Sequence, residues 1–312
     1  MIDLIVIGGG PAGLFCAQRV AAAGLQVLVL EKNTRAGKKL LVAGSGKCNI
    51  TNTGSIDHFL TSYGKKSRFV APSLRSFFNT DLISFFESHG LPLIELHSGK
   101  IFPQTLRSSD VLKVLISACE KTGVSLNYNS SVSEIIHKIE NENSCFSIVA
   151  NSEHYFSKYV LVSCGGVSWP VTGSTGDGYV FSQSLGHSIV EPRPALTPVI
   201  PAHYDCATCA GFSIQGAFIS LWRDGKKIAE RQGDVLFTHV GLSGPGILDF
   251  SRDFKPADEI SITLLSFING VSNGVSVSTT SNADSQLLSL CSSSPKKTVK
   301  NILCSLGLSE SL

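Results

Sequence analysis

The sequence predicts an α/β protein with two parts: a dinucleotide-binding domain built on a parallel sheet, residues 1–192, and a β-rich domain, residues 193–312. Two observations predict the first domain. One buried strand ends in a glycine-rich turn, and a second buried strand ends in an acid. The second domain is indicated by short alternating runs that follow the proline-rich segment Arg193–Pro198.

The glycine-rich turn follows the first apolar strand, Ile2–Ile7, and precedes a helical pattern, Leu14–Ala23. In a turn of the form Gly-x-Gly-x-x-Gly, the first glycine permits the bend and the second lets a pyrophosphate approach the backbone. The third glycine lets helix and strand pack closely, and the helix N-terminus attracts the phosphate. The cofactor-binding candidates here are Gly8, Gly10, Pro11, Ala12 and Gly13.

The acid that completes this Rossmann-like pattern is Glu31, at the end of the apolar run Gln26–Leu30 and before Lys32. It follows Gly13 by 18 positions, close to the interval of about 20 residues at which an acid binds the ribose hydroxyls. A carboxylate there disfavours a 2′-phosphate, so we expect a nucleotide of the FAD or NAD type. An ordinary βαβ unit is the alternative, and the position of the acid argues against it.

Composition and charge limit the class of protein. The chain has 312 residues, 43% hydrophobic and 16% charged, which indicates a globular protein. The net charge of +2 argues against a dominant nucleic-acid or membrane surface but leaves a local patch open. We expect no nucleic-acid partner and no membrane partner. The N-terminus lacks the basic region of a signal peptide, so the nine cysteines are expected to be reduced thiols in a cytoplasmic protein.

A loop rich in glycine and lysine follows the second strand, from Asn33 to Asn52. Its lysines favour contact with an anion, and a solvated basic loop explains the same residues equally well. Within it, GKKLLVAGSGKCNITN (residues 37–52) resembles the signature of the BaiN-like, or aminoacetone-oxidase-like, family of FAD-dependent oxidoreductases. These proteins have the glutathione-reductase-type FAD fold.

The resemblance implies FAD as the cofactor, and a loop that runs beside its pyrophosphate toward the flavin. The cofactor contacts that it implies are Lys38, Lys39, Gly46, Lys47, Cys48, Asn49 and Asn52. Ser45 replaces the usual glycine, and we expect strain there if φ is positive. Lys47 replaces the usual arginine, so it keeps the charge but loses the bidentate fork.

The remaining elements of the first domain are predicted from apolar spacing and end signals. Two helical patterns, Leu82–His89 and Ser109–Lys121, have Thr80 and Ser108 as predicted N-caps. Gly90 and Gly123 are the predicted C-terminal stops. From residue 124 the period changes to two, which predicts the strands Val124–Tyr128, Val132–Ile139, Cys145–Ala150 and Tyr155–Val162.

The family resemblance adds three positions in this region. In glutathione-reductase-type flavoproteins, backbone atoms at the start of a matching strand hold the adenine, which implies Val132 here. The strand Tyr159–Val162 and the residues after it resemble the second cofactor-facing turn, which implies Gly165 and Gly166. The spacing Ser174-x-x-Asp177 also predicts a capping box for a helix through residue 185.

The second domain is predicted to be an inserted, antiparallel, barrel-like β-domain. Its strand candidates are Phe212–Trp222, Lys227–Ala229, Val235–Phe237 and Ile260–Leu265. His239 lies before a glycine-rich turn, where a hydrogen-bonded structural role is more common than proton donation. Cys206 and Cys209 form a CxxC pair, which leaves a thioredoxin-reductase-like dithiol enzyme as an alternative. That enzyme needs a second glycine fingerprint, and none follows in the sequence. A zinc site needs a second ligand pair, which one CxxC does not supply, so no metal is expected.

The chain ends where Pro295–Leu303 resembles the start of the family's helical region, and we expect it to be truncated relative to the family pattern. The predicted function is that of an FAD-dependent oxidoreductase acting on a small organic substrate, with NAD(P)H as the electron donor. The alternative is a catalytically inactive, nucleotide-binding remnant. The sequence nominates no catalytic acid or base, and Lys47, Cys48 and His239 are no more than candidates for that role.

Overall fold

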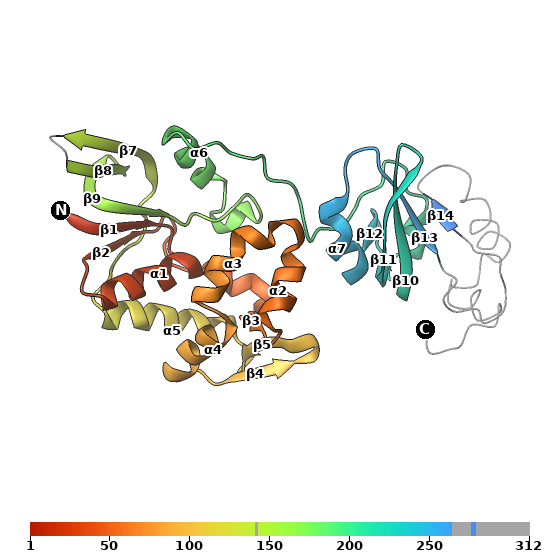
Figure 1. The fold of residues 1–312 in the computed structure, drawn as a ribbon, viewed down its shortest axis with the longest axis horizontal. Coiled ribbons are helices and arrows are strands. Elements are labelled where there is room, and N and C mark those ends of the chain that lie inside the picture. Colours follow the sequence, from red (N-terminus) through yellow and green to blue (C-terminus); the bar gives the residue numbers. More distant parts are fainter. Residues whose placement is uncertain (141–142, 264–275, 279–312) are drawn as a thin grey trace. The chain divides into compact units, whose positions relative to one another are not determined.

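The computed structural model describes residues 1–140, 143–263 and 276–278 (Figure 1). The chain divides into two compact units, Met1–Val190 and Glu191–Leu312, two residues before the predicted division. The predicted helical start at Pro295–Leu303 lies outside the described residues. Within the described residues, no helix is long and apolar enough to cross a membrane.

The first unit is built on a six-stranded sheet in the order β6-β2-β1-β9-β8-β7. The strands β1, β2, β6 and β9 run parallel, and β7, β8 and β9 form an antiparallel meander. This arrangement confirms the predicted parallel sheet and the four strands predicted after residue 124. The strand bounds are β1 Ile2–Ile7, β2 Val27–Leu30, β6 Ser125–Asn127, β7 Val132–Glu140, β8 Asn143–Ala150 and β9 Glu153–Val162.

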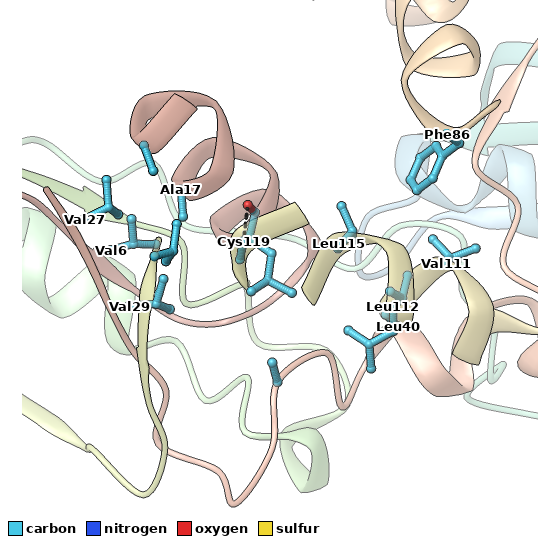
Figure 2. Close-up of a cluster of buried hydrophobic side chains, with 14 of the residues drawn as sticks. Val6, Ala17, Val27, Val29, Leu40, Phe86, Val111, Leu112, Leu115 and Cys119 are labelled. Carbon is cyan, nitrogen blue, oxygen red and sulfur yellow. Dashed lines mark hydrogen bonds between the residues drawn. The ribbon is translucent and has the colours of Figure 1, made fainter. Parts of the chain in front are cut away.

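Successive apolar side chains of the central strands point to opposite faces of this sheet, so both faces are packed against apolar residues. On one face, Leu4 and Val6 of β1 pack against α1 (Pro11–Ala22) and α5 (Ser108–Lys121). Figure 2 shows this cluster, with Ala17 of α1 and Leu115 and Cys119 of α5 directed into it. On the other face, Ile5 and Ile7 pack against the meander and Phe181 of α6 (Asp177–Ser184).

A second, smaller sheet lies between β2 and α5 in the sequence, in the order β3-β5-β4. Three short helices lie between its first and second strands in the sequence, and the sheet and these helices together make up most of the segment between residues 51 and 103. The bounds are β3 Thr51–Asn52, β4 Leu93–Leu96, β5 Lys100–Pro103, α2 Ile56–Tyr63, α3 Ser67–Ser76 and α4 Asn79–Ser88. The 3₁₀ helices of the first unit are η1 Leu40–Gly46, η2 Gly64–Lys66, η3 His97–Gly99 and η4 Pro170–Thr172.

Three predicted helix starts are wrong, each because another contact decides the boundary. Helix α4 begins before Thr80 because the Asp81 carboxylate accepts a 2.7 Å hydrogen bond from the Phe78 N–H. Helix α5 has Arg107 as its N-cap, and the Ser108 hydroxyl instead donates to the Leu41 carbonyl at 3.0 Å. The N-cap of α6 is Gly176, not Ser174, because the Asp177 carboxylate binds Lys32.

The second unit contains an antiparallel sheet in the order β12-β11-β10-β13-β14. The run predicted as two strands, Lys227–Ala229 and Val235–Phe237, is one strand, β11. Helix α7 (Pro245–Phe250) packs on this sheet, with Ile247 and Phe250 fully buried. The bounds are β10 Ser213–Arg223, β11 Lys226–Phe237, β12 Leu242–Ser243, β13 Glu259–Thr263 and β14 Ser276–Ser278, with 3₁₀ helices η5 Cys206–Cys209 and η6 Ser251–Asp253.

The packing of α5 on α1 predicts the effect of a cavity on stability. Leu115 is 2% exposed and lies in the cluster of Figure 2. We expect Leu115→Ala to lower the free energy of unfolding by about 2–5 kcal/mol, because the site loses buried methyl groups and keeps a cavity. Lys113→Ala, at an exposed position of the same helix, is expected to change it by less than about 0.5 kcal/mol. Urea denaturation followed by circular dichroism measures both, and equal losses would contradict the packing.

Candidate functional site

Three parallel strands of the first unit end at the same edge of the sheet. Strand β1 continues into Gly8, whose N–H donates to the Leu30 carbonyl of β2 at 2.9 Å. Strand β9 continues into Ser163, whose N–H donates to the Ile7 carbonyl at 2.9 Å. The carboxyl ends of parallel strands are where open α/β sheets bind their ligands. The glycine turn, Glu31 and the turn after β9 therefore meet at the expected place.

The three fingerprint glycines have different surroundings. A Cβ on Gly13 would lie 2.1 Å from the Gly8 carbonyl oxygen, so only glycine lets α1 approach the turn. Gly8 has φ +103°, and its Cβ would lie 2.6 Å from the Ser163 carbonyl oxygen. A Cβ on Gly10 would meet nothing within 4 Å. Gly8 and Gly13 are thus required by the fold, whereas Gly10 borders open space.

That open space is part of a pocket of about 690 Å³, a volume typical of small-molecule and cofactor sites. It lies between the glycine turn, the end of β2 and the turn after β9. Ten predicted cofactor-binding residues line it. They are Gly8, Gly10, Pro11, Ala12, Glu31, Lys32, Lys38, Lys39, Val132 and Gly165.

Helix α1 begins at the wall of this pocket with Gly10 as its N-cap and Pro11 in the first turn. The first N–H groups of a helix have no acceptor within the helix, and the helix dipole places positive charge there. Lys38 and Lys39 line the same pocket. Lys39 reaches toward the turn after β9, since its Nζ atom lies 3.7 Å from the position of a Cβ on Gly165. The pocket therefore presents donors and positive charge where a diphosphate is expected.

Glu31 is buried beside the glycine turn, with 7% of its surface exposed. One carboxylate oxygen accepts from the Gly9 N–H at 2.7 Å. The other accepts from the Asn33 N–H at 2.8 Å and from its side-chain amide at 2.7 Å. These donors fix the carboxylate at the pocket wall, and the oxygen bound to Gly9 retains a lone pair for a ribose hydroxyl.

Lys32 joins the end of β2 to the start of α6. Its Nζ donates to the Asp177 carboxylate at 2.7 Å and to the Thr175 hydroxyl at 2.8 Å. Burial raises the pKa of Asp177, but the hydrogen bonds from Lys32 and Thr175 and the charge of Lys32 outweigh it, so the pKa lies below its ordinary value. This ion pair ties two walls of the pocket together.

Gly165 lines the pocket in the turn after β9 and has φ +75°. A Cβ there would lie 2.8 Å from the hydroxyl oxygen of Ser174, which is buried. The neighbouring Cys164 thiol also lines the pocket, and burial raises its pKa to about 11. This thiol is therefore protonated at neutral pH.

Seven predicted cofactor-binding residues do not line the pocket. Gly13 lies behind the turn, where it packs α1 against β1. Cys48 is buried in the apolar cluster between the sheet and the helices, and burial raises its pKa, which argues against a reactive thiolate. Asn52 is used in the smaller sheet, where its amide donates to the Ser98 carbonyl at 2.8 Å. The others are Gly46, Lys47, Asn49 and Gly166.

One of the two departures from the family signature, Ser45, has the expected local consequence. Ser45, where glycine is usual, has φ +56° and ψ +37°, the left-handed conformation that costs a side chain energy. Lys47 is exposed. The strain predicted at Ser45 is confirmed.

The pocket also contains residues that the sequence reasoning did not select. Ser163 directly follows the end of β9, and Asn33 lies three residues after the end of β2, so their position after predicted strands was an available signal. Ser174 and Asp177 had been selected from their spacing only as a helix cap. Residues of the pocket that were not selected as cofactor-binding candidates include Cys16, Asn33, Ser130, Ser163, Cys164, Thr172, Gly173, Ser174, Asp177 and Tyr179.

In the second unit, the candidates for proton transfer or dithiol chemistry are His239, Cys206 and Cys209, and the contacts around them are structural. His239 is exposed in a turn that the Thr238 hydroxyl closes with hydrogen bonds to Gly241. Cys206 and Cys209 are half-buried in η5 and pack against the apolar core of this unit.

The model of a family described as HI0933-like protein Rossmann domain matches residues 2–288. The chain is 30% identical over 302 residues to the ribosomal RNA dihydrouridine synthase of Haemophilus influenzae, covering 96% of this chain and 70% of that protein. It is 28% identical over 266 residues to the Escherichia coli protein of the same name, covering 84% and 64%.

A third relative has a different substrate in its name. The chain is 28% identical over 250 residues to the 3-dehydro-bile acid delta(4,6)-reductase of Clostridium scindens, covering 79% of this chain and 59% of that protein. The chain thus spans between 59% and 70% of the length of these three relatives.

The different surroundings of Gly10 and Gly13 predict different effects of the same substitution. Gly10→Ala is expected to leave the unfolding free energy nearly unchanged but to weaken binding of an ADP-containing dinucleotide at least about tenfold, because the methyl group occupies the space beside the phosphate. Gly13→Ala is expected to lower both stability and binding. Denaturation and titration with the dinucleotide separate the two. Unchanged binding by Gly10→Ala would place the phosphates elsewhere.

The Lys32–Asp177 pair predicts a pH-dependent contribution to stability. Because the pKa of Asp177 is lowered in the folded chain, the contribution is present above the unfolded pKa of about 3.9 and is lost as pH falls through the folded value. Both side chains are about one-third exposed, so we expect Asp177→Asn to cost about 0.5–1 kcal/mol at pH 6–7.

Urea denaturation at several pH values measures this loss, which should shrink below about pH 4. Glu120→Gln, at an exposed position of α5, is the matched control and should show no such trend. A loss that persists at low pH would show that the ion pair is not its cause.

Proposed function

The chain belongs to the HI0933-like Rossmann family, whose relatives and fold indicate flavoprotein oxidoreductases, and from this premise we propose an FAD-dependent reductase. The reaction is reduction of a carbon–carbon double bond conjugated to a carbonyl group, with NAD(P)H as the electron donor. The observation that carries the proposal is the pocket at the strand ends, with the open space at Gly10 beside the start of α1 and two lysines.

The residues around the pocket fit FAD. The N–H groups at the start of α1 and the charges of Lys38 and Lys39 would hold the pyrophosphate. Glu31 would accept hydrogen bonds from the adenosine ribose, and Val132 would lie at the adenine. Bound FAD supplies hydride transfer, and the protein binds it, orients it and excludes water.

The reaction class rests on what the relatives' names share. Dihydrouridine is uridine with two hydrogens added across the double bond of its ring, and a delta(4,6)-reductase removes double bonds from a steroid. In each case the double bond is conjugated to a carbonyl group. The net reaction adds one hydride and one proton across that bond and oxidises NAD(P)H to NAD(P)⁺.

The substrate class divides into two candidates. A small organic molecule is the expectation from the family resemblance and is supported by the bile-acid relative. A uridine within RNA is the second candidate, supported by the greater identity to the ribosomal RNA enzyme of Haemophilus influenzae. The two candidates use the same chemistry at the pocket and differ in the surface that must bind the rest of the substrate.

The visible absorption spectrum of the purified chain tests the cofactor. We expect both absorption bands of oxidised flavin, at close to one flavin per chain, with bleaching by NADH or NADPH in the absence of oxygen. A colourless chain that folds and binds ADP would support the nucleotide-binding remnant instead.

Two further measurements test the reaction and the dithiol alternative. Incubation with NAD(P)H and either an unsaturated keto-steroid or a uridine-containing RNA should add two hydrogen atoms to one of them, detected by mass spectrometry. If the chain reduces a disulfide substrate and Cys206→Ser abolishes this, the thioredoxin-reductase-like alternative replaces our proposal.

A further inference from the structure

Positive charge is concentrated in one part of the chain. Residues 32–75 contain nine Lys or Arg and one acidic residue, Asp57, although the whole chain has a net charge of +2. The other parts of the chain are therefore net acidic. The small net charge hides a strongly basic segment, which begins at the pocket with Lys32 and continues through α2 and α3.

The distal part of this segment forms an exposed surface, here called the α2–α3 basic face. It consists of Tyr63, Lys65, Lys66, Arg68, Phe69 and Arg75, all exposed. Residues three, four and seven positions apart lie on one side of a helix, so Arg68 and Arg75 lie on the same side of α3. Val70 and Leu74 of α3, four positions apart, are half-buried on its other side.

The exposed aromatic side chains distinguish this face from an ordinary solvated helix. Phe69 is 85% exposed and Tyr63 is 48% exposed, and both lie among the cations. Within the described residues, Lys65, Lys66, Arg68 and Arg75 make no ion pair. A face of four unpaired cations with two exposed rings is complementary to a partner that offers both negative charge and flat apolar surfaces.

The face is fixed to the core of the same compact unit that contains the pocket. Phe77, which follows α3, contacts Phe15 of α1 with ring centroids 5.4 Å apart, and the Arg19 guanidinium lies 5.1 Å from the Phe77 ring. Cys16, next to Phe15, lines the pocket. At the other end, the Asn79 amide donates to the carbonyls of Asn52 and Gly54, just before α2. A partner on this face is therefore held at a fixed position relative to the pocket.

We propose that the α2–α3 basic face binds a single-stranded stretch of RNA, with the cations on phosphates and Phe69 and Tyr63 stacked on bases. Single-stranded nucleic acids are bound by this combination of basic groups and aromatic platforms. An acidic protein offers negative charge but need not present flat rings beside it, whereas every nucleotide carries both a phosphate and a base. A membrane surface requires an apolar helix face, whereas the apolar side of α3 packs toward the protein.

This inference deepens the proposed function, on which it rests for the chemistry, by assigning RNA as the substrate class. It replaces the expectation of no nucleic-acid partner, which was drawn from the net charge alone. RNA binding on this face is separable from flavin binding, because none of the six residues lines the pocket.

Fluorescence anisotropy with a labelled, unstructured RNA of about 12 nucleotides tests the inference. Site sizes of single-strand binders start at about 4 nucleotides, so this length covers the face. We expect binding that weakens with salt, with a slope of log K against log salt of about −2.8 for four phosphate contacts. The same titration with duplex RNA should give weaker binding, because paired bases cannot stack on the rings.

Three variants of the 312-residue chain separate the roles within the face. Lys65→Ala with Lys66→Ala should weaken binding and reduce the salt slope by about 1.4, since two phosphate contacts are lost. Phe69→Ala should weaken binding about tenfold or more without changing the slope. Lys113→Ala with Lys121→Ala removes the same charge from α5 and is the matched control, which should leave both quantities unchanged.

Folding and flavin content are checked by circular dichroism and the visible spectrum, and Lys65→Arg with Lys66→Arg should restore binding. Equal loss of RNA affinity in the α5 control would overturn the inference, since it would show non-specific attraction. Sedimentation with phosphatidylserine vesicles without RNA binding would also overturn it and assign the face to a membrane. RNA binding by a chain without flavin would support the face and contradict the proposed function instead.

Discussion

The close approach of α1 to the end of β1 is the contact on which the rest of the first unit depends. It is possible because Gly13 has no side chain: a Cβ there would lie 2.1 Å from the Gly8 carbonyl oxygen. This approach aims the first N–H groups of α1 at the space beside Gly10 and places Leu14 and Ala17 in the core with α5. Cofactor binding and core packing thus use the same short turn.

Around that turn, each wall of the pocket is fixed by a contact between segments distant in the sequence. Glu31 accepts from the Gly9 N–H, Lys32 pairs with Asp177, and Gly165 leaves room for Ser174. These contacts join the ends of β1, β2 and β9 to α6. The site is therefore rigid where a diphosphate and a ribose would bind, and the basic segment that leaves it leads to an exposed face on α2 and α3.

Much of the fold could be predicted from the sequence, because the signals involved are local. Apolar period and glycine position predicted β1, β2 and the strands after residue 124, and Gly90 and Gly123 predicted the ends of α4 and α5. The glycine fingerprint and the loop of residues 37–52 predicted the family, which the match over residues 2–288 confirms. Ten of the predicted cofactor residues line one pocket, and two of them, Gly8 and Glu31, directly follow the ends of adjacent parallel strands.

Only the tertiary structure decided which polar side chains face that pocket. Ser174 and Asp177 fitted a capping box by spacing, but Lys32, 145 positions from Asp177, takes the carboxylate. Cys48 and Asn52 belong to a loop that resembles a cofactor loop, yet burial and the smaller sheet use their side chains. A residue's own sequence determines its backbone preference, whereas its partners depend on segments that only folding brings together.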